Sequence, residues 1–150
     1  MIAAVTFAGL VLAAAATGAI FKPGPWYEEL QKPSWTPPNW MFPVVWTCLY
    51  IMIGYAGWII WTNTGQVTAA LVFWGLQLVL NGFWSWLFFG LRRMDLALVD
   101  VVLLWAAIAG FILAAWPVST LAALLFLPYL AWVTTAGLLN LTVIRLNPAV

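Results

Sequence analysis

The sequence has 150 residues, of which 66% are hydrophobic, 17% aromatic and only 6% charged, and its mean hydropathy is +1.05. Soluble domains are typically about 45–50% apolar and about 25% charged, so this chain could not cover a water-facing surface. These values exclude a soluble enzyme, a nucleic-acid-binding protein and a disordered chain. They predict an integral membrane protein with a single domain over residues 1–150.

The sequence also restricts the chemistry that one chain can perform. It contains no histidine and a single cysteine, Cys48. A Ser-His-Asp triad, a Cys/His metal site and an intrachain disulfide therefore cannot form. We expect no metal site and no required cofactor, and we expect Cys48 to be a small buried apolar side chain.

Five apolar runs are long enough to cross a bilayer as helices, which requires about 20 residues each. They cover approximately residues 2–21, 42–61, 66–90, 96–115 and 119–144. Strands of a membrane barrel would be about 10 residues long with alternating polarity, whereas these runs are longer and apolar on all sides. The fold class is therefore all-α, a bundle of five transmembrane helices. The first run has no preceding basic residue and is long for a signal peptide, so we interpret it as a helix.

The basic residues predict the orientation of this bundle. With five spans, every one of them falls on the side that holds the 22–40 loop, the 91–95 loop and the C-terminus. They are Lys22, Lys32, Arg92, Arg93 and Arg145. The excess of Lys and Arg marks the cytoplasmic side, so we expect the N-terminus outside and the C-terminus inside.

The loop at residues 22–40 is long and contains five prolines and three tryptophans. Long loops without secondary structure are often functional, and proline stiffens the backbone. One interpretation is a stiff lid over the cytoplasmic mouth of the bundle. The other is an interfacial loop whose indole rings anchor in lipid headgroups. The two interpretations are compatible with each other.

Aromatic and amide side chains recur at helical spacing on three of the predicted helices. The stripes are Trp46, Tyr50, Gly54, Gly57 and Trp61 on the second, Gln77, Asn81, Trp84 and Phe88 on the third, and Tyr129, Trp132, Ala136 and Leu139 on the fifth. Amides facing lipid would be unsatisfied at a cost of a few kcal/mol, so we expect Gln77 and Asn81 to face the interior. The stripes indicate either helix packing alone or a cavity beneath the loop, suited to a large, flat, mostly apolar ligand.

The third predicted helix has a second face that carries Gly75, Gly82 and Gly90. Small residues allow membrane helices to approach closely and to associate. We therefore expect a homodimer whose interface includes these three glycines.

Two residues interrupt the apolar pattern of the last two helices. Pro128 lies inside the fifth run, where it should kink the helix and widen the space near Trp132. Asp100 lies about one turn into the fourth run. A carboxylate within a membrane helix is a candidate for a functional role such as a proton relay, but its shallow depth favours an interfacial ion pair with Arg92 or Arg93.

The same residues form motifs that resemble the signature of the TspO/MBR family, the bacterial tryptophan-rich sensory proteins and mitochondrial translocator proteins. The first motif is KPSWTPPNW at residues 32–40, followed by FP at 42–43 and WTCLY at 46–50. Later motifs follow in order: QL at 77–78, LN at 80–81, FFG at 88–90, PYLAW at 128–132 and LN at 139–140. The resemblance covers nearly the whole chain, and its first motif is highly specific.

This resemblance implies a five-helix bundle, commonly homodimeric, that binds porphyrins such as protoporphyrin IX, sterols, and isoquinoline carboxamide or benzodiazepine drugs. The ligand-site positions that it implies are Tyr27, Trp35, Pro37, Trp40, Phe42, Trp46, Asn81, Trp84, Trp132, Ala136 and Leu139. The residue pattern adds Tyr50 and Gln77. Some bacterial members are reported to degrade porphyrin in light and oxygen, which makes Trp46 and Trp132 the candidate catalytic residues.

The sequence departs from mammalian members of the family at two positions. The sterol-recognition motif near the end of the last helix requires a tyrosine before its basic residue, and here Arg145 has no such aromatic partner, so we expect sterol binding to be weak. A ligand-lining tryptophan at the start of the fourth helix is replaced by Leu96. We expect lower drug affinity as a result.

Three hypotheses for function follow. The leading one is a membrane receptor or transporter for porphyrins and similar ligands, with a sensory or regulatory role in tetrapyrrole metabolism or stress. The second is light- and oxygen-dependent breakdown of porphyrin through pocket tryptophans. The third is a membrane scaffold without a ligand. The short chain and its charge asymmetry favour a bacterial inner membrane over an outer one.

Overall fold

The computed structural model describes residues 1–148 and is formed of helices joined by short connections and one long loop. The elements are α1 (Ile2–Ile20), α2 (Pro25–Glu29), α3 (Met41–Thr64), α4 (Ala69–Ser85), η1 (Trp86–Gly90), α5 (Met94–Ala115), α6 (Thr120–Leu125) and α7 (Leu127–Leu146). Within the described residues, five stretches are long and apolar enough to cross a membrane, because α4 continues into η1 and α6 into α7. The predicted fold class is confirmed, and the span limits differ from the predicted ones by at most three residues.

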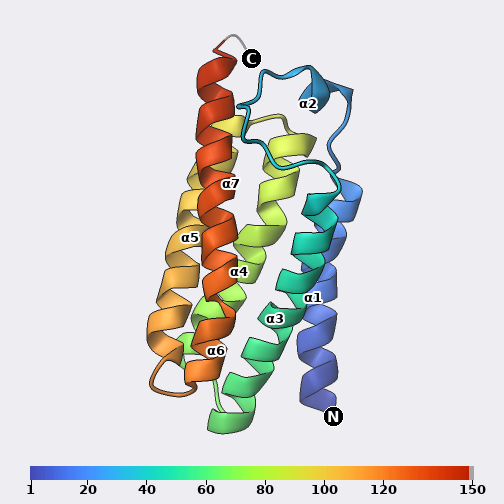
Figure 1. Cartoon of the computed structure of the whole chain (residues 1–150). Helices are drawn as coiled ribbons and strands as arrows, with labels where there is room; N and C mark the ends of the chain where they lie inside the picture. The colour runs from blue at the N-terminus through green and yellow to red at the C-terminus, as the bar shows by residue number, and fades with distance from the viewer. Residues whose placement is uncertain (149–150) are drawn as a thin grey trace.

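The helices run side by side along one elongated bundle (Figure 1). α5 packs against α4 and α7, whereas α1 packs against α3 and α4 at the edge of the bundle. α1 has only three buried residues, Phe7, Val11 and Ala14. The interior is therefore formed mainly by α3, α4, α5 and α7.

One end of the bundle carries the long loop, the connection between η1 and α5, and the end of α7 (Figure 1). All five basic residues of the sequence lie in these segments. The observed topology thus places the positive charges together, as the prediction of the cytoplasmic side requires.

The last transmembrane stretch is broken at Phe126, which ends α6 and precedes α7. Pro128 stands in the first turn of α7, where its missing N–H removes no bond from the helix that it begins. The buried Phe126 ring lies 3.9 Å from the Phe111 ring between centroids, and this contact holds the break in the core. The predicted interruption of this stretch is therefore present, but it lies at Phe126, two residues before Pro128, and Pro128 begins the second helix and does not kink its interior.

Two glycines of the α3 stripe serve helix packing against α1 and α4, which was one of the two interpretations of the stripe. A Cβ at Gly54 would lie 3.5 Å from Val11, and one at Gly57 would lie 2.6 Å from the Trp74 indole and 2.9 Å from Phe7. These glycines allow α1 and the Trp74 ring of α4 to approach the α3 backbone.

The glycines predicted to form a dimer interface also have partners within the chain. A Cβ at Gly82 would lie 3.7 Å from Thr17, and one at Gly90 would lie 2.9 Å from Phe21. Both positions therefore serve the packing of α1 and the segment after it, and the homodimer stays a prediction. Gly75 differs, because a Cβ added there would meet no atom of residues 1–148 within 4 Å.

Candidate functional site

The two predicted amides lie in the interior of the bundle and are joined by tyrosine hydroxyls from neighbouring helices. Gln77 is 0% exposed and Asn81 is 5% exposed. Asn81 Nδ2 donates to the Tyr129 hydroxyl at 2.7 Å, and this hydroxyl donates to Gln77 Oε1 at 2.8 Å. The Tyr50 hydroxyl donates to Asn81 Oδ1 at 2.9 Å. These four side chains, which we call the amide–tyrosine network, link α3, α4 and α7.

The network leaves one polar atom without a partner. Gln77 Nε2 is buried and makes no hydrogen bond to any residue in 1–148. A buried donor of this kind costs about 1–3 kcal/mol when it stays unpaired. It is therefore a donor available to an acceptor oxygen of a bound molecule.

Aromatic rings border the network on the side of α3 and α7. The Trp46 ring stacks on the Tyr50 ring with 5.4 Å between centroids and meets the Tyr129 ring edge-on at 6.3 Å. Phe42, one turn earlier on α3, lies edge-on to Trp132 of α7 at 5.6 Å. The structure thus brings together these predicted site residues from two helices that are distant in sequence.

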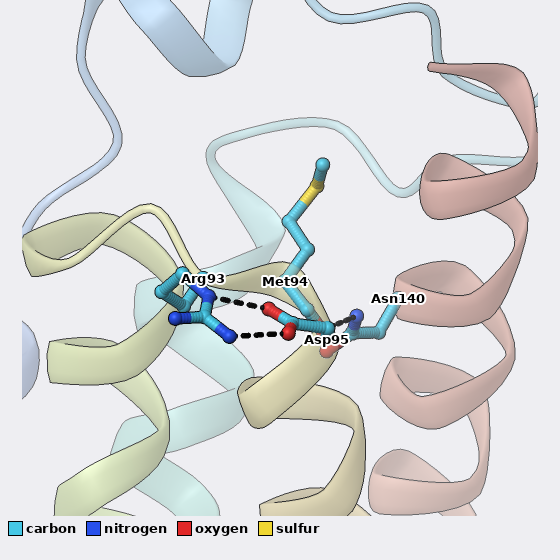
Figure 2. A network of polar contacts seen from close by, with 4 residues as sticks. All are labelled: Arg93, Met94, Asp95 and Asn140. Carbon is cyan, nitrogen blue, oxygen red and sulfur yellow. Dashed lines mark hydrogen bonds and ion pairs between the residues drawn. The ribbon is translucent and has the colours of Figure 1, made fainter. Parts of the chain in front are cut away.

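Trp84 belongs to a second series of hydrogen bonds, closer to the end of the bundle that the 22–40 loop covers. Its indole N–H donates to Asn140 Oδ1 at 3.2 Å, and Asn140 Nδ2 donates to the Met94 carbonyl oxygen at 3.0 Å. Figure 2 shows how Asn140 of α7 reaches the first turn of α5. The Trp84 ring stacks on Phe88 at 5.0 Å, so that its orientation is fixed from both sides.

The charged pair at the start of α5 differs from the predicted one. Arg93 binds Asp95 through two hydrogen bonds of 2.8 and 2.6 Å (Figure 2). Asp100 does not form the expected pair with Arg92 or Arg93, because its side chain is 6% exposed and faces the bundle interior. Its Oδ2 has no hydrogen-bond partner in the part of the chain that the structure describes.

The long loop covers one end of the bundle, near the start of α5 and the end of α7, and contains the short helix α2, which the sequence did not predict (Figure 1). Tyr27 of α2 is 6% exposed, and its ring contacts Phe88 and Phe89 edge-on at 6.1 and 5.4 Å. Burial raises the pKa of the Tyr27 phenol above its ordinary value. Tyr27 thus packs the loop onto the bundle.

The second half of the loop is more open. Trp35 and Trp40 are 49% and 65% exposed, and Pro37 is half-buried. These three predicted site residues are therefore not brought into the amide–tyrosine network, whose hydrogen bonds within residues 1–148 join only α3, α4 and α7. Ala136 is half-buried on α7. Leu139 is buried with Tyr27 and Met94 in a small apolar cluster beneath the loop.

An apolar groove of about 440 Å³ lies between α3 and α7 and is lined in part by Trp132. Its other lining residues are Val44, Val45, Cys48, Leu49, Met52, Pro128, Ala131 and Thr135. Cys48 is exposed here, which corrects the expectation that it is buried. A groove of similar volume lies between α1 and α4, next to Gly82.

Sequence reasoning missed two residues that organise the site. Tyr129 stands at the centre of the network, whereas the sequence pattern indicated only a member of an aromatic stripe. The available signal was its position three residues before Trp132, which places both side chains on the same face of the helix. Asn140 holds Trp84, and its only signal was its place in the LN motif at 139–140.

Comparison with known proteins places this architecture in one family. The model of the TspO/MBR family matches residues 2–146. The chain is 44% identical to Protein CrtK of Rhodobacter capsulatus over 138 residues, which cover 90% of this chain and 86% of that protein. It is 45% identical to the tryptophan-rich protein TspO of Chlorobaculum tepidum over 150 residues, with 93% and 92% coverage. It is 46% identical to the human translocator protein over 126 residues, with 81% and 75% coverage. The chain therefore belongs to the TspO/MBR family.

Proposed function

We propose that this multi-pass membrane receptor binds protoporphyrin IX and similar flat, mostly apolar ligands and takes part in sensing or regulating tetrapyrrole metabolism or stress. Family membership and the names of its relatives support the receptor or sensory role. The observation that carries the finer proposal is the amide–tyrosine network, which lies in the mostly apolar interior of the bundle and is bordered by the Trp46 ring.

The chemistry of these residues suits a large aromatic ligand. Indole and phenyl rings such as Trp46, Phe42 and Trp132 offer flat apolar faces on which a conjugated ring can stack. Gln77 Nε2 is a donor for a ligand carbonyl or carboxylate oxygen. Isoquinoline carboxamide and benzodiazepine-type ligands combine the same two features, and they belong to the same proposal.

A titration with protoporphyrin IX tests this proposal. The porphyrin should quench tryptophan fluorescence saturably and shift its own absorption band. Replacing Trp46 and Trp132 together by phenylalanine should weaken binding about tenfold, which corresponds to about 1.4 kcal/mol. The absorption band of the porphyrin measures affinity independently of the number of tryptophans that remain.

The matched control replaces two tryptophans remote from this site, Trp116→Phe and Trp61→Phe. Trp116 is exposed just after the C-terminal end of α5, away from the end that the loop covers, and Trp61 lies in the last turn of α3. The control should bind porphyrin as the unaltered protein does. Equal affinity of the two double variants, with both proteins folded, would show that the ligand does not lie at Trp46 and Trp132.

The proposed homodimer is best tested at Gly75, where no residue in 1–148 occupies the space beside the helix. In a Cys48→Ala background, Gly75→Cys should form disulfide-linked dimers under mild oxidation in the membrane. The control is Leu113→Cys, at a position that is 76% exposed and lies on another helix, α5. The dimer fraction is measured on non-reducing gels, and equal cross-linking at both positions would argue against an interface at Gly75.

A further inference from the structure

The end of α7 carries a side chain that is bonded both to its own helix and to the loop. Asn147 Nδ2 donates to the Val143 carbonyl oxygen at 2.8 Å, within the last turn of α7. The Asn147 backbone N–H also donates to this carbonyl, at 3.1 Å. The position of the Asn147 amide is therefore fixed relative to the helix.

The same amide pairs with the backbone of Gln31, which is 116 residues away in the sequence. The Gln31 N–H donates to Asn147 Oδ1 at 3.0 Å, and Asn147 Nδ2 donates to the Gln31 carbonyl oxygen at 2.9 Å. Asparagine suits this pairing because its short side chain carries one acceptor and one donor group. Aspartate has the same shape but no donor when ionised.

Gln31 lies at the border between the packed and the open part of the loop. Before it, Tyr27 and Leu30 are buried against the bundle. Lys32 follows, and its Nζ donates to the carbonyl oxygens of Tyr27, Glu28 and Leu30 at 2.7, 3.3 and 3.3 Å. Through these bonds the Lys32 side chain caps the carbonyl oxygens at the C-terminal end of α2. Beyond them the loop is exposed at Trp35 and Trp40.

We propose that Asn147 is a latch that holds the loop closed over the bundle and so sets the rate at which ligand exchanges with the site beneath it. It is a positioning residue, because it acts through Gln31 and is not part of the network. The inference about ligand exchange rests on the proposed function, whereas the latch itself does not require a ligand.

Proteolysis in detergent measures the latch without any ligand. The only glutamates of the chain, Glu28 and Glu29, are exposed on α2. A glutamate-specific endopeptidase can cleave there only when α2 leaves the bundle and unfolds. Asn147→Ala removes both bonds to Gln31, whereas Asn147→Asp keeps an acceptor for the Gln31 N–H, loses the bond donated by Nδ2 and places a carboxylate oxygen against the Gln31 carbonyl oxygen. Each variant should raise the cleavage rate about tenfold, as expected for the loss of one or two hydrogen bonds of ordinary strength.

The alanine variant separates loss of the bonds from the charge that aspartate adds at a helix C-terminus. Asn39→Asp is the matched control, because Asn39 is exposed in the open part of the same loop. Its cleavage rate should stay unchanged. The unfolding temperatures of all variants are measured alongside, and faster cleavage must occur at temperatures where the bundle remains folded.

The second measurement is the dissociation rate of protoporphyrin IX in stopped-flow experiments. Both Asn147 variants should release the porphyrin about tenfold faster than the Asn39 variant, in proportion to their cleavage rates. Unchanged cleavage would overturn the latch. Faster cleavage with unchanged release would overturn its control of ligand exchange. Absence of porphyrin binding in the unaltered protein would instead contradict the proposed function, while cleavage would still decide whether Asn147 holds the loop.

Discussion

Gly57→Ala is expected to lower the free energy of unfolding by about 1–3 kcal/mol, the usual cost of overpacking a filled interior. The added methyl group would lie 2.6 Å from Trp74 Cε2 and Nε1 and 2.9 Å from Phe7. The Trp74 ring cannot simply move away, because its N–H donates to the Ile53 carbonyl oxygen at 2.8 Å. Relief of the clash must therefore break this bond or displace α1. The unfolding temperature in detergent, followed by circular dichroism, measures the effect.

Gly9→Ala is the matched control for this variant. It makes the same change on α1, where no atom of residues 1–148 lies within 4 Å of the new methyl group. The control should leave the unfolding temperature unchanged or raise it slightly, because alanine favours the helix. Equal stability of the two variants would show that α1, α3 and α4 are less closely packed at Gly57 than the structure indicates.

Tyr129→Phe is expected to destabilise the bundle by about 1–2 kcal/mol, although it removes a single oxygen atom. Tyr129 is 0% exposed, and its hydroxyl is bonded to both amides of the network. Its loss leaves Asn81 Nδ2 without an acceptor and Gln77 Oε1 without a donor. The two amides are one turn apart on α4, so a new bond between them would set the lower limit of the effect.

Tyr55→Phe provides the control, since Tyr55 is 46% exposed and stacks on Trp58 at the surface of α3. It should change the unfolding temperature little. A double-mutant cycle with Gln77→Leu should show coupling between Tyr129 and Gln77. Additive effects of Tyr129→Phe and Gln77→Leu would contradict the bond between them.

The helices could be predicted because membrane insertion imposes a simple requirement on the sequence. A span must satisfy its own backbone, so long apolar runs become helices whatever their neighbours are. The burial of Gln77 and Asn81 followed from the same solvent argument, and it is confirmed by their exposed fractions of 0% and 5%. Proline chemistry also predicted an interruption of the last stretch, which the structure places at Phe126, just before the turn that Pro128 begins.

The pairing of particular side chains could not be predicted in this way. Asp95 and Asp100 are both close to Arg93 in sequence, and only the direction in which each side chain faces separates the exposed pair from the buried carboxylate. The glycine stripes had two possible partners, a second copy or α1, and periodicity does not distinguish them. The contact between Asn147 and Gln31 depends on how the loop crosses the bundle, which no local pattern records.

The amide–tyrosine network has a consequence for selectivity. Each of its hydrogen bonds uses a donor or acceptor that could otherwise bind a ligand. Asn81, for example, already accepts from the Tyr50 hydroxyl and donates to the Tyr129 hydroxyl. A wholly apolar molecule that separated these side chains would leave several polar atoms unpaired, and each would cost about 1–3 kcal/mol. Only a molecule that returns a donor or acceptor for each bond it breaks can enter this region without that penalty. The network would therefore act as a filter against hydrocarbon chains of the surrounding lipid, which have no polar group to exchange.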